Sequence, residues 1–507
     1  MNKVLSVILT AFLVALFPSE IQAKTDLHDT IENELLRAYA TTVFSQPKDM
    51  AAVNKQLAKQ YRPILLSRFL KYVTYNSQSS YTEEITPGQI EMAKALHEEI
   101  KDMGYKDAVL TDHYYIFVRI PSNLPEGTTA PILGFSAHYD VTPDVTTNNV
   151  NANVITNYRG GKIELGVNPQ GEKQILDPDT PRDAYLKTQI GNMIITSDGT
   201  TNLGADDRAG LSIVMTTLEV LAKHPEKKHG EMQIVIAPNE ETGGAADFIA
   251  GVPYRPEIAF DFDGSVDGEL MTDNFNALRI LVTVKGHEGH QSNADGPYVN
   301  HGLAAADLIH QVYEDPSIPR RFADNSIVNL NSSCSRWLRL PSESRDREGY
   351  LDVFTNRPSN DTTVVDFRAR SFAQADLDQL EDFIREIVKF LSAKYTKVDF
   401  SIKTESTYNN VGETAHPASF RVSKSAFEAA GVKMRPVSER AGTTGAIFAA
   451  ATKNLPQKIV GSYMLFTGQN NMHSYTEWLS VDDMNKSFLV GLNIIDQVVV
   501  LLGTEQK

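Results

Sequence analysis

Histidine and acidic residues gather in four short clusters between residues 138 and 263. The clusters are centred on His138 and Asp140, on Asp206 and Asp207, on Glu240 and Glu241, and on Asp263. Imidazole and carboxylate groups are ligands suited to zinc. A carboxylate beside such a metal can also take the proton of an attacking water. These residue types therefore predict metal-assisted hydrolysis.

Each cluster has an ordinary alternative when it is taken alone. His138 with Asp140 is better explained as a structural histidine bonded to an aspartate in a turn. One acid of the Asp206-Asp207 pair is explained as a helix cap, but two acids between glycines are not. The Glu240-Glu241 pair fits a metal site and the cap of a helix over 243–250 equally well.

The combination of clusters favours the metal site. Open α/β sheets place their ligands at the carboxyl ends of strands. Four acidic or histidine clusters at four strand ends are hard to explain as unrelated caps. This prediction is independent of any family comparison.

Apolar runs predict the elements that must position these clusters. Residues 131–137, 232–237 and 258–262 are expected to be buried strands, and residues 209–221 a helix. Strands that alternate with helices are typical of a mixed, mostly parallel sheet between helix layers. The predicted fold class is therefore α/β.

The pattern changes near residue 276, where alternating strands and amphipathic helices indicate a smaller α+β domain. Its expected elements are strands over 278–285, 362–368 and 397–403 and helices over 302–313 and 373–394. The predicted organisation is a signal peptide (1–23), an N-terminal helical extension (24–61), a catalytic domain in two parts (62–275 and 408–507) and an inserted lid or dimerisation domain (276–407).

The first residues have the pattern of a secretory signal. A lysine at position 3 precedes an apolar run over 4–17, and Ile21-Gln22-Ala23 is an acceptable cleavage site. An uncleaved anchor is the alternative, although the run is shorter than the about 20 residues that span a bilayer. We expect a mature start near Lys24 and a secreted protein, periplasmic in a Gram-negative bacterium. No later segment is expected to span a membrane.

Composition limits the partners and the ligands. A chain of 507 residues is long enough for two domains. The formal net charge of -16 excludes nucleic acid as a partner, because phosphates require a basic face. Cys334 is the only cysteine, so a metal site must use histidine and carboxylates, and no internal disulfide can form.

The chain resembles the zinc exopeptidase clan of aminoacylases and carboxypeptidases, and within it the peptidase T family of tripeptide aminopeptidases. The resemblance runs from about Ile64 to the C-terminal helix. Besides the acidic clusters, it is carried by residues 157–161, 195–199, 273–277 and 465–468, which read NYRGG, ITSDG, DNFNA and LFTG.

The resemblance implies two zinc ions per subunit and a role for each cluster. His138 and Asp263 would hold one zinc, Glu241 and His473 the other, and Asp206 would bridge them. Asp140 would orient His138, and Glu240 would be the general base. The resemblance also implies a cis peptide bond between Asp206 and Asp207.

Further roles in substrate recognition follow from the same resemblance. His290 would reach the active site of the partner subunit in a homodimer. Arg440 would bind the substrate carboxylate, and Asp207 is assigned to substrate binding with it. The turn over 441–445 departs from the family pattern, and this departure bears on substrate preference.

The function expected from these observations is a two-zinc aminopeptidase that releases N-terminal residues from short peptides, with tripeptides as substrates. A carboxypeptidase, dipeptidase or amide deacylase of the same clan is the first alternative, since it would keep the ligands and change the pocket. A non-catalytic peptide-binding protein is the second alternative, although it predicts a lost ligand or base.

Overall fold

The structure is a computed structural model that describes residues 47–287, 299–313 and 347–505. The predicted signal peptide, most of the N-terminal extension, His290 and Cys334 lie outside the described residues. The chain divides into two compact units, Met1–Leu57 and Ala58–Lys507. Helix α3 (Pro47–Tyr72) is continuous across the predicted boundary between residues 61 and 62.

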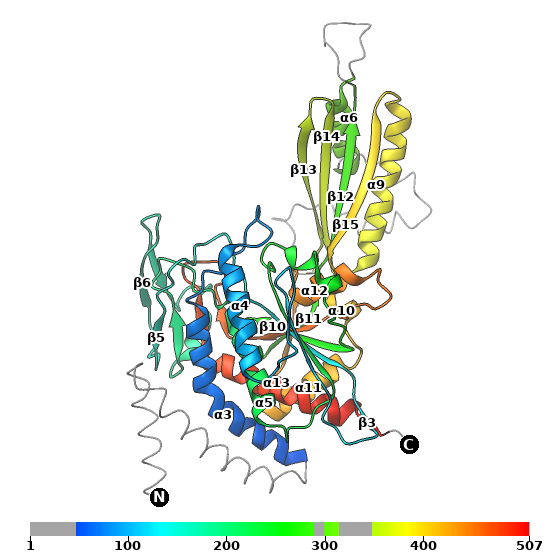
Figure 1. The fold of residues 1–507 in the computed structure, drawn as a ribbon. Coiled ribbons are helices and arrows are strands. Elements are labelled where there is room, and N and C mark those ends of the chain that lie inside the picture. Colours follow the sequence, from blue (N-terminus) through cyan, green and yellow to red (C-terminus); the bar gives the residue numbers. More distant parts are fainter. Residues whose placement is uncertain (1–46, 288–298, 314–346, 506–507) are drawn as a thin grey trace, which may run out of the picture. The chain divides into compact units, whose positions relative to one another are not determined.

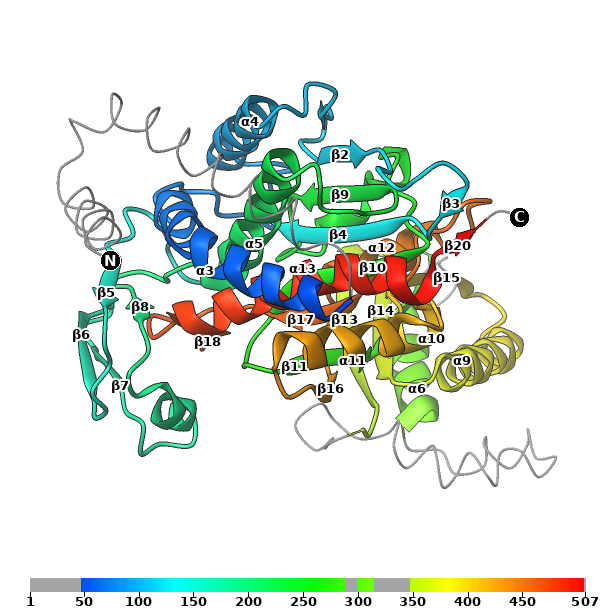
Figure 2. The same cartoon turned by 90° about the horizontal axis from the view of Figure 1, so that it is seen from below.

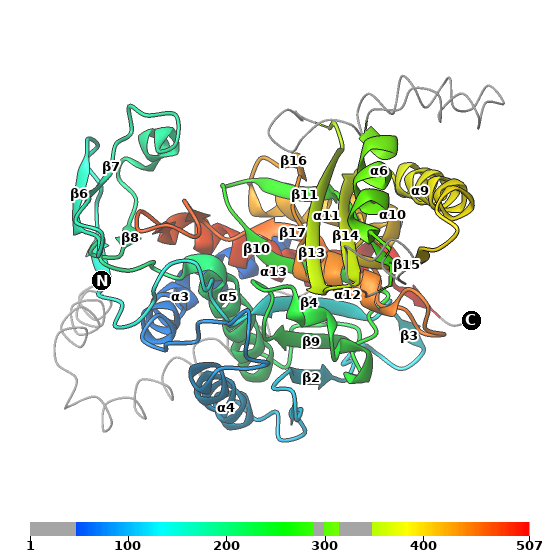
Figure 3. The same ribbon diagram turned by 90° about the horizontal axis from the view of Figure 1, so that it is seen from above.

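The second unit is built on an eight-stranded sheet (Figure 3). Its strands, in spatial order, are β1 (Val109–Leu110), β2 (Ile116–Ile120), β9 (Met232–Ala237), β4 (Leu133–His138), β10 (Ile258–Gly264), β17 (Tyr463–Phe466), β11 (Glu269–Asn274) and β16 (Arg435–Glu439). The four central strands β9, β4, β10 and β17 are parallel. Strand β2 is antiparallel to β9, and β11 is antiparallel to β17. The mixed, mostly parallel sheet predicted from the sequence is confirmed.

Helices cover both faces of this sheet. Helices α5 (Ala205–Lys223), α11 (Ser419–Ala430) and α13 (Val481–Leu502) lie on one face (Figure 2), and α12 (Thr444–Thr452) lies on the other side of β10 (Figure 1). Helix α13 approaches β10 closely, because a Cβ added at Gly491 would lie 2.9 Å from Phe262 Cζ. Glycine at this position therefore allows the helix to pack against the buried ring.

Helix α13 corrects one expectation from the sequence. The sequence predicted that no segment after the signal peptide is apolar enough to span a membrane. By length and composition, however, α13 could cross one. In the fold, 61% of its most apolar stretch is buried. The core helices of globular domains have the same composition, because burial selects the same side chains.

A second, antiparallel sheet forms the inserted α+β region. It contains β13 (Tyr350–Ser359), β14 (Thr362–Ser371), β12 (Asn276–Lys285) and β15 (Asp399–Tyr408), in that order. Helices α6 (His301–Tyr313) and α9 (Gln374–Lys394) pack against it and share one apolar core with its strands (Figure 1). Strand β13 was not expected from the sequence.

A third sheet, also unexpected, joins two distant parts of the chain. Its strands are β18 (Gln469–Asn470), β19 (Trp478–Ser480), β8 (Ile194–Thr196) and β5 (Asn153–Ile155). The loop between β18 and β19 carries His473, so this sheet fixes both ends of that loop. The remaining elements are α4 (Pro87–Asp102), α10 (Val411–Thr414), β3 (Thr128–Thr129) paired with β20 (Thr504–Glu505), β6 (Ile163–Val167) paired with β7 (Lys173–Leu176), and the 3-10 helix η2 (Ala184–Gln189).

The segment after the glutamate pair is not the helix considered over 243–250. Two short 3-10 turns, Gly244–Ala246 and Ile249–Gly251, replace it. Gly243 has a φ of 75°, in the left-handed region, so the backbone turns sharply here instead of continuing as a helix.

Candidate metal centre

The parallel strands bring the predicted ligands to one edge of the sheet. His138 ends β4, Asp263 is the last residue but one of β10, and Glu241 follows β9. Asp206 stands at the start of α5, and His473 comes from the loop between β18 and β19. Two groups of potential ligand atoms result, His138 with Asp206 and Asp263, and Asp206 with Glu241 and His473. Within each group the atoms lie within 4.8 Å of one another.

Asp206 belongs to both groups and faces each histidine with a different oxygen. Its Oδ1 lies 3.3 Å from His138 Nε2, and its Oδ2 lies 3.3 Å from His473 Nε2. His138 Nε2 is also 3.7 Å from Asp263 Oδ2, and His473 Nε2 is 2.7 Å from Glu241 Oε2. This is the arrangement of a carboxylate that bridges two ligand sets.

The donor atoms fit a pair of divalent metal ions. His138 is fully buried, yet its Nε2 has no hydrogen-bond partner within the described part of the chain, and neither has Glu241 Oε1. Buried polar atoms almost always have partners, so orphaned atoms that converge on one point require an explanation. The nitrogen and oxygen donors present are those that zinc accepts in proteins.

Asp140 holds two of the clusters in place. The Nδ1 of His138 donates to the backbone carbonyl of Asp140 at 3.1 Å, which leaves Nε2 as the nitrogen with a free lone pair. The carboxylate of Asp140 accepts from the backbone N–H groups of Glu240 and Glu241, at 3.0 and 3.2 Å. One buried residue therefore orients a histidine ligand and the glutamate pair together.

Two further carboxylates, for which the sequence indicated no role, support the site. Glu477 is fully buried and accepts from the backbone N–H groups of Gly204 and Asp206, at 2.5 and 3.0 Å. Burial raises the pKa of Glu477 to about 8. Asp261 accepts from Ser136 Oγ at 2.8 Å, which links β10 to β4. Asp261 is recognisable in the sequence only by its place two residues before Asp263.

The peptide bond between Asp206 and Asp207 is cis, as the resemblance implied. Asp207 itself does not face the site in the way expected of a substrate-binding residue. Its side chain is fully buried, and its two oxygens accept from the backbone N–H groups of His138 and Gly210, at 3.2 and 3.0 Å. The carboxylate of Asp207 therefore serves the backbone, and its role in substrate binding stays a prediction.

The protonation of the site without metal reflects its crowded charges. Hydrogen bonds to Asp206 and Glu241 raise the pKa of His473 to about 11. Burial and the charge of Asp206 raise the pKa of Glu241 to about 8. A protonated imidazole cannot be a ligand, so a metal that binds here displaces that proton.

Glu240 lies beside the ligand groups without belonging to either. Its Oε2 is 4.0 Å from His138 Nε2, and 14% of its side chain is exposed. Burial raises its pKa well above the usual value, and the charges of Asp263, Asp140 and Asp206 act in the same direction, against the opposing charge of His138. A carboxylate with a raised pKa suits a residue that takes and returns a proton near neutral pH.

A cavity of about 390 Å³ opens at the two ligand groups. Asp206, Glu240, Glu241, Asp263 and His473 line it, together with residues of β11, β16 and β17. Among its described lining residues are Glu439 and Ala441, the two sequence neighbours of Arg440, but not Arg440 itself. The Nη1 of Arg440 donates to the backbone carbonyl of Glu348 at 3.3 Å. The guanidinium of Arg440 also lies 5.0 Å from the ring centre of Phe275.

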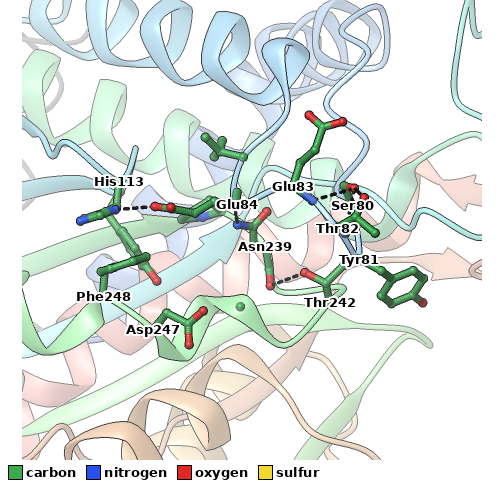
Figure 4. Close-up of a pocket in the computed structure, with 14 residues that line it drawn as sticks. Ser80, Tyr81, Thr82, Glu83, Glu84, His113, Asn239, Thr242, Asp247 and Phe248 are labelled. Carbon is green, nitrogen blue, oxygen red and sulfur yellow. Dashed lines mark hydrogen bonds and ion pairs between the residues drawn. The ribbon is translucent and has the colours of Figure 1, made fainter. Parts of the chain in front are cut away.

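A second cavity of about 400 Å³ shares one wall with the metal centre (Figure 4). Pro238, Asn239, Thr242 and Gly244 line it, whereas Glu240 and Glu241 of the same loop line the first cavity. Gln89 donates to Asn239 Oδ1 at 2.7 Å, and so holds this loop from the side of α4. His113 and Phe248 also line this cavity, and their rings stack with their centres 3.3 Å apart.

Comparison with known proteins places the chain in a family. Residues 203–497 match the model described as Peptidase family M20/M25/M40. A protein named Peptidase T from Halothermothrix orenii is 31% identical over 437 residues, which cover 85% of this chain and 98% of that protein. Peptidase T from Geobacillus kaustophilus is 31% identical over 439 residues, with 85% and 97% covered.

Solved structures share the fold. The aminopeptidase PepT from Bacillus cereus covers 86% of this chain and 99% of its own, with a TM-score of 0.57 and 17% identity. A tripeptidase from Staphylococcus aureus covers 87% and 99%, with a TM-score of 0.56 and 19% identity. The family model and the curated relatives together show that this chain belongs to peptidase family M20/M25/M40 and, within it, to the peptidase T group of hydrolases.

Proposed function

We propose that the protein is a two-zinc aminopeptidase that releases the N-terminal residue of short peptides, tripeptides among them. The observation that carries the proposal is the pair of ligand groups that share Asp206, with Glu240 beside them in one cavity. Membership of the peptidase T group supports the direction of cleavage. Among the structural neighbours, one is described as a tripeptidase, and a Bacillus subtilis protein of the M20 family as a dinuclear metal-binding peptidase.

Each ligand group would hold one metal ion. His138 and Asp263 would bind the first ion, Glu241 and His473 the second, and Asp206 would contact both. When bound, the two ions would supply Lewis acidity at the peptide carbonyl and lower the pKa of a water molecule. The chain itself keeps the ligands in place through Asp140, which fixes His138 and the loop of Glu241.

Glu240 would move the proton. Its carboxylate takes a proton from the attacking water and returns it to the amine of the leaving peptide. Burial raises the pKa of Glu240 well above its usual value. The raised pKa favours a carboxylate that can hold the proton between its removal from water and its delivery to the amine. The backbone N–H bond to Asp140 fixes the base in position while its oxygens stay free to act.

The proposal predicts that Leu-Gly-Gly is hydrolysed to leucine and Gly-Gly, and that the N-acetylated tripeptide is hydrolysed much more slowly. The physical reason is that an aminopeptidase must recognise the free amine beside the scissile bond. Chromatography of the products over time measures both the rate and the end from which residues leave. Preference for the blocked peptide would support a deacylase or carboxypeptidase, and release of glycine first would point to cleavage from the other end.

We also propose that the mature protein starts near Lys24 and forms a homodimer in the periplasm of a Gram-negative bacterium, without a membrane or nucleic-acid partner. The signal pattern over residues 1–23 motivates the first part, and the family resemblance of His290 motivates the second. Native mass spectrometry of the protein purified from its host tests both. The expected result is twice the mass of residues 24–507; a subunit that retains Met1, or a fully active monomer, would contradict the proposal.

A further inference from the structure

The cavity at the metal centre has an apolar floor that the metal chemistry does not use. Met271 of β11, Val437 of β16 and Met464 of β17 line it, and Met271 pairs with Val437 across the two strands. Methionine side chains adapt to the shape of what they contact, so such a floor suits an aliphatic chain. The floor therefore has room and chemistry for a substrate side chain beside the scissile bond.

Two carboxylates that belong to neither ligand group stand at the ends of this floor. Glu269 precedes Met271 by two residues, and Glu439 follows Val437 by two residues. Residues two apart on a strand face the same side, so all four side chains point into the cavity. The Cα of each glutamate lies roughly 7 Å along its strand from the Cα of its apolar neighbour.

The two carboxylates differ in their partners. Glu269 Oε2 accepts from the backbone N–H of Val266 at 3.3 Å, and Glu269 Oε1 lies 3.9 Å from Arg435 Nη2. The carboxylate of Glu439 has no hydrogen bond or ion pair to any residue that the structure describes. The adjacent Arg440 donates to the carbonyl of Glu348. Glu439 is thus an unpaired acid that lines the catalytic cavity.

We propose that Glu439 makes this enzyme select peptides with a basic side chain, lysine or arginine. The aliphatic stem would lie on Met271, Val437 and Met464, and the charged head would reach the carboxylate of Glu439. Lysine and arginine bury their stems on apolar surface while the charged end seeks an acid, which matches this order of groups. The same carboxylate repels acidic side chains. The inference rests on the proposed aminopeptidase function and names its substrate class.

The test compares lysine with norleucine, which has the same stem without the charge. Peptides are made from Leu-Gly-Gly by replacing one of its three residues at a time, once with lysine and once with norleucine. At one position the wild-type ratio of kcat/KM for lysine over norleucine should be about tenfold or more, as expected for a hydrogen bond to a charged group. In Glu439→Gln, which keeps the shape of the side chain, the ratio should fall to within about twofold of one.

Control variants separate this role from a general effect. Glu428→Gln changes an exposed glutamate of α11 and should keep the wild-type ratio. Glu439→Lys should reverse the preference, so that a peptide with glutamate is cleaved faster than one with lysine. Melting temperatures of the variants, measured in parallel, show that each is folded.

The inference is overturned if the wild-type ratio is near one at all three positions, or if Glu439→Gln leaves it unchanged. If Leu-Gly-Gly itself is not hydrolysed, the proposed function has failed instead. In that case, calorimetry measures the affinities of the same lysine and norleucine peptides. The ratio of these affinities does not depend on turnover, so it tests the role of Glu439 separately from the proposed function. Equal affinities for the lysine and norleucine peptides would contradict the proposed role of Glu439.

Discussion

Glu240→Gln is expected to lower kcat for Leu-Gly-Gly by about 10²–10⁴-fold, the usual contribution of a general base. Glutamine keeps the size of the side chain but cannot take a proton from water. The residue belongs to neither ligand group, so the variant should keep the metal content of the wild-type protein. Steady-state rates and metal analysis on the same sample measure both results.

The control for this variant is Glu428→Gln, at an exposed position on α11. It should match the wild-type enzyme in rate and in metal content. A Glu240→Gln enzyme with a near-normal rate would exclude Glu240 as the base. A slow variant that has also lost metal would show that Glu240 is a ligand instead.

Asp206→Asn is expected to empty both metal positions and abolish hydrolysis. Each carboxylate oxygen of Asp206 lies 3.3 Å from one histidine, so the loss of its charge affects both ligand groups. The affinity should fall by more than the about 10–100-fold loss that follows removal of an outer partner of a ligand. Metal analysis after dialysis gives the number of ions that remain.

His473→Ala provides the contrast, because His473 belongs to one group only. That variant should retain one metal ion where Asp206→Asn retains none. Asp179→Asn changes a side chain that is 80% exposed, and should bind metal like the wild-type protein. Two ions in Asp206→Asn would contradict the bridging role, and an unchanged metal content in His473→Ala would show that another residue binds in its place.

Local patterns explain why much of the catalytic domain was predictable. Strand β9 occupies the predicted residues 232–237, and β10 includes the predicted 258–262, because a short, largely apolar run marks a strand buried on both faces. His138 and Asp263 follow from such runs, since each lies at or next to the end of its strand. The carboxyl ends of parallel strands meet at one edge, so these positions predict proximity.

The contacts that position His473 could not be predicted from local sequence patterns. Strands β18 and β19 have two and three residues, which is too short for an alternating pattern to be recognised. The loop is held by Asn471, whose Nδ2 donates to Asp183 Oδ1 at 2.8 Å across 288 residues of sequence. Glu477 similarly reaches the backbone of Gly204 over 273 residues. Only the family resemblance pointed to His473.

Other differences arise where the tertiary structure overrides a local signal. The acids at 240 and 241 could have capped a helix, but Asp140 accepts from both of their backbone N–H groups and a sharp turn at Gly243 follows. Asp207 was assigned to substrate, yet His138 and Gly210 donate their backbone N–H groups to its carboxylate. In both places a contact between residues distant in sequence, from Asp140 to the loop of Glu240 and from Asp207 to His138, adds to the local signal.

The most direct test of the account is a zinc titration of the metal-free protein, with the release of leucine from Leu-Gly-Gly followed at each point. The two ligand groups that share Asp206 predict that each chain binds two equivalents, and that full activity requires the second. Binding of a single equivalent with full activity, or two equivalents without release of leucine, would contradict the two-metal aminopeptidase.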